Sequence, residues 1–211
     1  MTVTNTMDNI NKHEILLQKQ LQQSQIQELK KLDPALEVIS DTTILSSVLG
    51  LSSTMKYFQT NQLDFKIIGN PNALVCIFEF FNGTMGFPEK YSKGLLRITP
   101  INNSELLIDM SVSQMQPGEW KLDIYSYGDF SNELESIGDV AIMVDKIKID
   151  ADGNGRLNKV IDGHIFDLIG RAACLVDKDG QFVGGILARS AGLFENKKRV
   201  CACSGRTIWE E

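Results

Sequence analysis

Histidine and cysteine are both scarce in this sequence. The 211 residues include two histidines, His13 and His164, and four cysteines. A catalytic metal site usually takes three protein ligands, and the two histidines fall in different predicted domains. We therefore predict that both histidines are surface residues and not metal ligands.

An excess of basic residues is also missing. The chain has 21 Lys and Arg against 27 Asp and Glu, which gives a formal net charge of -6 and a pI near 5.0. Proteins that bind nucleic acids usually present a basic face to the phosphates. The composition therefore argues against a nucleic-acid partner.

Long apolar runs are absent too. A transmembrane helix needs ~20 mostly apolar residues, and no stretch of the sequence provides them. The start, "MTVTNTMDNINKHEILL", has no basic region followed by an apolar one, so it does not read as a secretory signal. We expect no transmembrane segment and a reducing, intracellular setting. There, closely spaced cysteines more often bind metals or exchange with thiols than form structural disulfides.

The pattern of apolar and polar residues changes near Gly69 to Pro71, where we place a domain boundary. Before it, residues 11–33 are rich in helix formers and predict a helix, and "DTTILSSVLGLSSTMKYF" predicts a second helix capped by Asp41 or Thr42. The strands "PALEVIS" and "LDFKIIG" flank the second helix. After the boundary, seven or eight short apolar runs separated by turn residues indicate an antiparallel sandwich or Greek-key barrel.

The run "DADGNG" at residues 150–155 matches the front half of an EF-hand calcium loop. The twelfth position of that loop is Ile161 where a bidentate glutamate is needed, and the preceding "VAIMVDKIKI" alternates as a strand does. We therefore predict a hairpin turn built from Asp, Asn and Gly.

Cys201 and Cys203 stand one residue apart in the last stretch, "KKRVCACSGRTIWEE". In an extended segment both side chains point to the same side, and their Cα atoms would lie ~6.5 to 7 Å apart, at the upper limit for an unstrained disulfide. The neighbouring Lys and Arg residues favour the thiolate form. Two thiolates suit a transferable Cu(I) better than a closed zinc site. Spacing alone leaves open that these are two thiols without a function.

Cys76 and Cys174 lie inside apolar runs, and we predict that both are buried.

Residues 184–211, "GGILARSAGLFENKKRVCACSGRTIWEE", resemble the C-terminal segment of the copper chaperones for superoxide dismutase. The resemblance rests on "ARSAG", the Cys-X-Cys pair and "TIWEE". Residues 73–188 are more weakly similar to Cu,Zn superoxide dismutase through "GLLRI", "YGDFSNELESIG", "ADGNG" and "DLIGR".

The resemblance implies a mainly β protein in three parts. Residues 1–69 would form an N-terminal helix and a degenerate α/β region of ferredoxin-like type. Residues 70–192 would form a dismutase-like, eight-stranded Greek-key β-barrel that docks on the client. Residues 193–211 would form a copper-delivery tail.

The implied function is that of a metallochaperone and not of an enzyme. The barrel would dock on immature Cu,Zn superoxide dismutase as one dismutase subunit docks on another. Cys201 and Cys203 would carry Cu(I) to the client and help to form its disulfide by thiol exchange. The residues that match the dismutase dimer surface are Tyr127, Gly128, Ile186, Gly192 and Leu193.

Two alternatives stay open: a copper-independent docking partner of the dismutase, and a thiol-disulfide oxidoreductase. Self-association as a homodimer and contact with a copper transporter at membranes also stay open. The expected location is the cytoplasm, with the mitochondrial intermembrane space as a second compartment. Arg189 is a candidate for holding the base of the tail, with a plain structural role equally open.

The sequence departs from the dismutase pattern at its metal positions. The resemblance places the first copper-binding histidines of the enzyme at Asp123 and Tyr125, the bridging histidine near Val140 and the later copper histidine at about Val176. We therefore expect no dismutase activity.

Two further features of the families are missing. The structural disulfide of the dismutases corresponds to about Leu134 and Gly184, and residues 1–75 contain no cysteine, so the chaperone family's Met-X-Cys-X-X-Cys copper loop is absent. Cys201 and Cys203 are left as the expected copper ligands.

Overall fold

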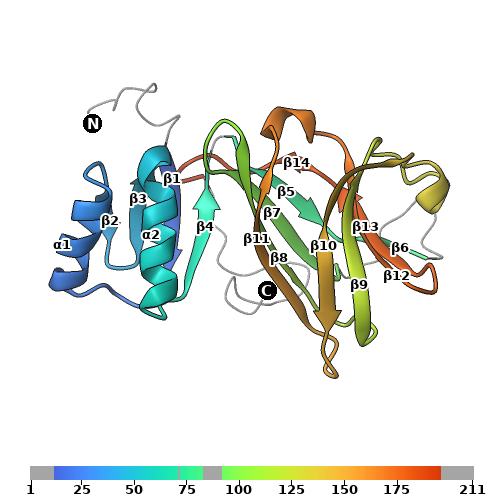
Figure 1. Cartoon of the computed structure of the whole chain (residues 1–211), viewed down its shortest axis with the longest axis horizontal. Coiled ribbons are helices and arrows are strands. Elements are labelled where there is room, and N and C mark those ends of the chain that lie inside the picture. The colour runs from blue at the N-terminus through green and yellow to red at the C-terminus, as the bar shows by residue number, and fades with distance from the viewer. Residues whose placement is uncertain (1–11, 71, 83–91, 196–211) are drawn as a thin grey trace. The chain divides into compact units, whose positions relative to one another are not determined.

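A computed structural model describes residues 12–70, 72–82 and 92–195. The described residues fall into two compact units. The first unit takes residues 12–73, 99–104 and 190–195, and the second takes 74–98 and 105–189. The elements of both units are labelled in Figure 1.

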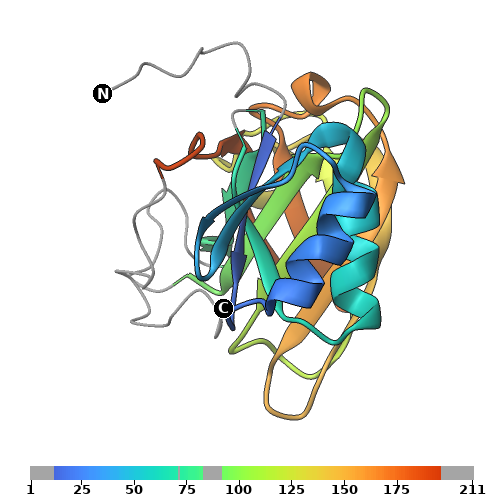
Figure 2. The ribbon, with the colours of Figure 1, turned by 90° about the vertical axis from the view of Figure 1, so that its left-hand side faces the viewer.

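The first unit is built from two helices and four strands. In chain order these are β1 (Lys12–Leu17), α1 (Gln23–Leu32), β2 (Glu37–Ser40), β3 (Thr43–Ser47), α2 (Val48–Thr60) and β4 (Phe65–Gly69). The strands form one antiparallel sheet in the order β2-β3-β1-β4. Both helices lie on one face of this sheet (Figure 2). This is the βαββαβ order of ferredoxin-like units.

The prediction of a helix over residues 11–33 is wrong for its first third, because Lys12–Leu17 is a strand. This strand lies between β3 and β4 and is almost entirely buried, so sheet pairing outweighs the helix propensity of the neighbouring residues. Similarly, Thr43–Ser47 is a strand, and α2 begins after Ser47 and not after Asp41 or Thr42. The two predicted strands over "PALEVIS" and "LDFKIIG" are confirmed as β2 and β4.

A buried carboxylate joins the end of α1 to the start of α2. Asp33 accepts hydrogen bonds at 2.8 Å from the hydroxyls of Ser46 and Ser47 and from the Ser47 N–H. The Ser47 hydroxyl in turn accepts from the Gly50 N–H at 2.9 Å, which caps α2. A Cβ atom at Gly50 would lie 2.1 Å from Cγ of Asp33, so this junction needs glycine.

The second unit is mainly β. Its strands are β5 (Leu74–Ile77), β6 (Phe80–Phe81), β7 (Gly94–Pro100), β8 (Glu105–Val112), β9 (Gly118–Tyr125), β10 (Val140–Ile149), β11 (Gly155–Asp162), β12 (Ala172–Asp177), β13 (Phe182–Ile186) and β14 (Ala188–Arg189). They form two five-stranded sheets in the orders β10-β9-β12-β13-β6 and β11-β8-β7-β5-β14. All of the recorded pairings in these sheets are antiparallel.

One apolar core receives side chains from both sheets. Examples from the first sheet are Trp120, Leu122 and Leu175, and examples from the second are Leu96 and Ile108. The alternation of apolar residues along each strand places these side chains on the shared face. A mainly β domain with antiparallel sheets, as the sequence predicted, is confirmed, and it is compatible with a β-barrel.

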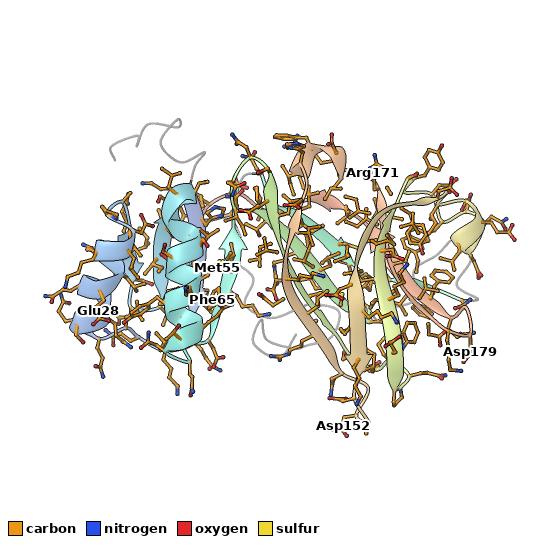
Figure 3. All side chains as sticks on the ribbon, in the orientation of Figure 1. Glu28, Met55, Phe65, Asp152, Arg171 and Asp179 are labelled. Carbon is orange, nitrogen blue, oxygen red and sulfur yellow. The ribbon has the colours of Figure 1, made fainter. Side chains whose placement is uncertain are left out.

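The predicted turn in "DADGNG" is confirmed. Asp152 lies at the tip of the β10–β11 hairpin (Figure 3). One carboxylate oxygen of Asp150 accepts from the N–H groups of Asp152 at 3.0 Å and Asn154 at 2.8 Å, and Gly153 has φ of 80°. Backbone donors thus occupy the oxygen that would stand first in a calcium loop.

Neither of the two helices in the described part of the chain is both long and apolar enough to cross a bilayer.

Candidate functional site

A groove of about 510 Å³ opens in the second unit, over strands β9, β10 and β12. Its lining includes Asp123, Tyr125, Val140 and Val176. These are the four positions at which the resemblance places the copper-binding and bridging histidines of dismutase. The fold therefore brings together residues that lie up to 53 positions apart in the sequence.

An ion pair between two of the lining residues lies in this groove. Asp123 is only 3% exposed, and its Oδ2 lies 2.8 Å from Nζ of Lys121. Its Oδ1 has no hydrogen-bond partner among the described residues. The Lys121 ammonium therefore supplies the positive charge beside this buried carboxylate.

Tyr125 adds a neutral phenol to the groove. Burial, together with the nearby Cys174 and Asp123, raises the pKa of Tyr125 to about 12. Among the residues that the structure describes, no group of three His, Cys, Asp or Glu side chains could hold a metal ion.

An apolar cluster lies at Leu134 and Gly184, the positions to which the resemblance assigns the dismutase disulfide. Leu134 packs against the cluster that contains Phe130, and Phe130 stacks on Phe80 with 4.5 Å between ring centroids. A Cβ atom at Gly184 would lie 2.5 Å from Sγ of Cys174 and 2.9 Å from the Phe130 ring. A cysteine at position 184 would therefore displace this cluster.

The two cysteines in the described part of the second unit have no chemical role that the structure supports. Cys76 and Cys174 are free and fully buried, as predicted. Burial raises the pKa of both thiols well above the usual range, so both stay neutral and are poor nucleophiles and ligands.

Tyr127, Gly128 and Ile186, three of the predicted partner-binding residues, lie together in the second unit. A Cβ atom at Gly128 would lie 3.3 Å from the Ile186 side chain and 2.1 Å from the Gly170 carbonyl oxygen. The Tyr127 side chain is 64% exposed and that of Ile186 is 39% exposed. Ile169 adds a further exposed apolar side chain next to Gly170.

Backbone hydrogen bonds fix this apolar face. The Tyr127 carbonyl accepts from the Ala172 N–H, and the Tyr127 N–H donates to Ile137, both at 2.9 Å. Arg171, labelled in Figure 3, donates to the carbonyl oxygens of Asp167 at 2.5 Å and Ser126 at 3.4 Å. The exposed side chains of Tyr127 and Ile186 thus stand on a well-supported backbone.

Gly192 and Leu193, the other two predicted contact residues, belong to the first unit. They lie in the segment 190–195, where the Phe194 N–H donates to Oε2 of Glu14 at 2.7 Å. The Ala191 carbonyl accepts from the Asn70 N–H at 3.4 Å. Sequence reasoning missed Glu14 and Asn70, because Glu14 stood inside a predicted helix and a contact over 180 positions leaves no local signal.

Cys201 and Cys203, the predicted copper ligands, lie outside the described residues. Their ligand role stays a prediction.

The prediction of a surface position is wrong for His13, while His164 is exposed. His13 lies on the central strand β1, and Nδ2 of Asn70 is 2.9 Å from its Nδ1. Burial lowers the pKa of His13 to about 4, so the imidazole is neutral at pH 7 and accepts this hydrogen bond at Nδ1. His13 is therefore a buried structural residue.

Comparisons with known proteins agree on one family, although no protein-family model matches the chain. A "Superoxide dismutase 1 copper chaperone" of Candida glabrata is 32% identical over 156 residues, covering 68% of this chain and 65% of the relative. The protein of the same name in Debaryomyces hansenii is 31% identical over 194 residues, covering 76% and 75%. The "Copper chaperone for superoxide dismutase" of Homo sapiens is 29% identical over 157 residues, covering 56% and 57%.

The chain spans 65% of the length of the Candida glabrata and Kluyveromyces lactis relatives that it matches. Among solved structures, the clock protein EA4 matches at 17% identity with a TM-score of 0.43, which is too low to support an argument. The identity of 31% over three quarters of the Debaryomyces hansenii protein shows that the chain belongs to the family of copper chaperones for superoxide dismutase.

Proposed function

We propose that the protein is a metallochaperone that docks on immature Cu,Zn superoxide dismutase and delivers Cu(I) through Cys201 and Cys203. The observation that carries this proposal is the groove of the second unit. The groove is lined by Asp123, Tyr125, Val140 and Val176, the positions to which the resemblance assigns the dismutase histidines, and Lys121 forms an ion pair with Asp123. A dismutase-like groove without its metal ligands suits a protein that imitates the enzyme's surface and not its chemistry. The names of the relatives support the same function.

The second unit is, in this proposal, the dismutase-like Greek-key barrel. Its strands β6 and β14 have two residues each, and the remaining eight strands are divided equally between the two sheets. Neighbours that are not consecutive in the chain, such as β9 and β12, are typical of Greek-key connections.

Docking would use the face of Tyr127, Gly128 and Ile186. Two exposed apolar side chains around a glycine that permits close approach favour a protein–protein contact. Because the matching surface of dismutase joins identical subunits, one client subunit would take the place of the second copy.

The C-terminal tail, residues 193–211, would bind and transfer Cu(I) and exchange thiols with the client. As thiolates, Cys201 and Cys203 would hold Cu(I) in a low-coordinate site from which the ion can pass to the client. When the pair is instead joined as a disulfide, a client thiolate would attack one sulfur, and the second client thiolate would resolve the mixed disulfide. The client then gains a disulfide and the tail regains two thiols, so electrons balance. The first unit would take no part in copper uptake, because residues 1–75 contain no cysteine.

The protein would act in the compartments in which its client is found. We propose action in the cytoplasm and the mitochondrial intermembrane space, which fractionation of cells with an antibody to the protein would test.

The test is Cu(I) binding under anaerobic conditions, by competition with a Cu(I) chelator. Wild type should bind one Cu(I), and the variant Cys201→Ser/Cys203→Ser should bind none. The variant Cys76→Ala/Cys174→Ala is the matched control and should bind as wild type does, because both of these thiols are buried. If wild type binds no Cu(I) but still binds the client, the protein is a docking or disulfide-forming partner instead.

A further inference from the structure

The segment that leads into the C-terminal tail is held by the first unit. Residues 190–195 belong to this unit, together with β1 and β4. Three hydrogen bonds fix the segment to it. The Ser190 N–H donates to the Ala73 carbonyl at 2.9 Å, the Asn70 N–H donates to the Ala191 carbonyl at 3.4 Å, and the Phe194 N–H donates to Oε2 of Glu14 at 2.7 Å.

The contact with Glu14 is the strongest of the three. Its acceptor is a carboxylate that is only 3% exposed, and hydrogen bonds to charged groups are shorter and about twice as strong as neutral ones. A buried charge is costly unless it is paired or hydrogen-bonded. The Phe194 N–H is therefore a needed partner of Glu14.

The surrounding backbone is shaped for this contact. The pairing of β1 with β4 shifts register between Glu14, which lies opposite Gly69, and Ile15, which lies opposite Ile67, so the ladder is irregular at Glu14. A Cβ atom at Gly69 would lie 2.6 Å from Oε2 of Glu14 and 2.9 Å from the Gly192 carbonyl oxygen. Only glycine leaves room for the carboxylate and the segment to approach each other here.

The segment itself adopts a special conformation. Phe194 has φ of 61°, which is uncommon for a residue other than glycine. The Gly192 N–H donates to Oε2 of Glu195 at 2.9 Å and closes a turn. A turn with this geometry presents the Phe194 N–H to Glu14.

From these contacts we infer that Glu14 is a positioning residue for copper delivery. The first unit, which carries no copper-binding cysteine, serves as the clamp that fixes the base of the tail. Cys201 follows Phe194 by seven residues, so the chain keeps it within about 25 Å of Phe194, and the anchor fixes the point on the first unit from which the tail reaches. The clamp restricts the space that the thiols search to the surroundings of this fixed point, and it raises their effective concentration within that space. This inference rests on the proposed function, because it assigns the thiols their task.

The anchor is tested first by amide hydrogen exchange over residues 190–195 of the full chain. Glu14→Met keeps the size of the side chain and removes the acceptor, so exchange in this segment should become about tenfold faster or more. Glu14→Gln keeps an acceptor oxygen and should change exchange less. Glu28→Gln, at an exposed position of α1 where the amide oxygen can still accept from the Tyr57 hydroxyl, is the matched control and should leave exchange unchanged.

The role in delivery is tested with the same variants. Glu14→Met should bind Cu(I) with unchanged affinity and activate copper-free dismutase several-fold more slowly, and Glu14→Gln should be intermediate. Unchanged exchange in Glu14→Met would overturn the anchor. Faster exchange with an unchanged rate of activation would overturn the positioning role.

Two further outcomes, a variant that does not fold and a wild type that binds no Cu(I), are also decided by experiment. If Glu14→Met does not fold, Phe194→Pro removes the donor at a residue that is 45% exposed, and because proline cannot adopt φ of 61° it also removes the turn that presents the donor. It should therefore give faster exchange at the neighbouring residues and slower activation. If wild type binds no Cu(I), the proposed function fails, while the exchange measurement still decides whether Glu14 anchors the segment.

Discussion

The ammonium of Lys121 lies 2.8 Å from a carboxylate oxygen of Asp123, two residues further along the same strand. Side chains two apart on a strand share one face of the sheet, and this face lines the groove in the second unit. The lysine side chain is 45% exposed and the aspartate side chain is 4% exposed, so water reaches only one partner of the pair. The groove therefore contains a cationic side chain beside its buried carboxylate.

Removing this cation should destabilise the second unit. Lys121→Met leaves the buried carboxylate unpaired, and we expect a loss of about 1–2 kcal/mol in the free energy of unfolding, less than for a fully buried pair because water reaches the lysine. Urea unfolding followed by tryptophan fluorescence measures it, since Trp120 lies on the same strand. Adding Asp123→Leu should restore stability. Lys146→Met breaks an exposed pair with Glu119 and should change nothing measurable, and equal stability of Lys121→Met and wild type would contradict the assignment.

Sequence patterns predicted the second unit better than the first. In a strand with one buried face, apolar residues recur at every second position, and turn residues mark its ends. Both signals are local, so runs such as "ELLIDMSV" and "EWKLDIYS" indicated β8 and β9 directly. The strand β1 gave the opposite result, because "KHEILL" has no alternation when both of its faces are buried. Its neighbours β3 and β4 in the sheet are distant in sequence, and only this pairing makes it a strand.

The candidate site was also predicted only in part from the sequence. The resemblance assigned Asp123, Tyr125, Val140 and Val176 one by one, and the structure gathered them in a single groove. Lys121 was not predicted, since a lysine beside an aspartate on a strand is common at surfaces. Its importance comes from the burial of Asp123, which sequence does not reveal.

Acid should weaken the first unit through His13. The folded state holds this imidazole neutral, with its pKa lowered by burial to about 4, while the unfolded chain has the ordinary value of 6.5. The contribution of His13 to stability is therefore fully present above pH 6.5 and is lost as pH falls toward 4, where the unfolded state binds the additional proton. Over this window we expect a loss of about 3 kcal/mol.

Urea unfolding between pH 4 and 7, followed by circular dichroism, measures this loss. His13→Gln should be less stable at pH 7 and show a flatter dependence on pH. His164→Gln changes the exposed histidine of the second unit and is the matched control. An identical pH profile for His13→Gln and wild type would show that His13 is not responsible.

Alanine at Gly50 should destabilise the protein, although alanine usually favours helices. The added Cβ would lie 2.1 Å from Cγ of Asp33, which four hydrogen-bond donors hold in place. Overpacking of this kind costs about 1–3 kcal/mol, more than the gain of about 1 kcal/mol from helix propensity. Thermal unfolding of Gly50→Ala tests this, with Ser53→Ala at an exposed position of α2 as the control. A higher melting temperature in Gly50→Ala would show that the junction tolerates a methyl group.

The buried thiols should resist alkylation. In the variant Cys201→Ser/Cys203→Ser the remaining cysteines are Cys76 and Cys174, both buried with raised pKa values. Iodoacetamide at pH 8 should therefore leave the folded variant unmodified and add two groups after unfolding in urea, as counted by mass spectrometry. Rapid modification of the folded variant would mean that one of the two thiols is accessible and would open a second candidate for copper binding or thiol exchange.

A charge at Ile186 should disrupt docking. This side chain is 39% exposed and lies against Gly128 beside Tyr127, so Ile186→Lys would place an ammonium in the middle of the proposed apolar contact. Residues at the centre of an interface commonly contribute 2 kcal/mol or more, so we expect affinity for copper-free dismutase to fall by about thirtyfold, measured by calorimetry. Val160→Lys is the matched control, because Val160 is 46% exposed on β11, in the other sheet. Equal losses in both variants would point to a general effect of charge, and no loss in Ile186→Lys would move the client contact away from this face. The Cu(I) affinity of Ile186→Lys should equal that of wild type, because docking and copper binding use different residues in the proposed mechanism.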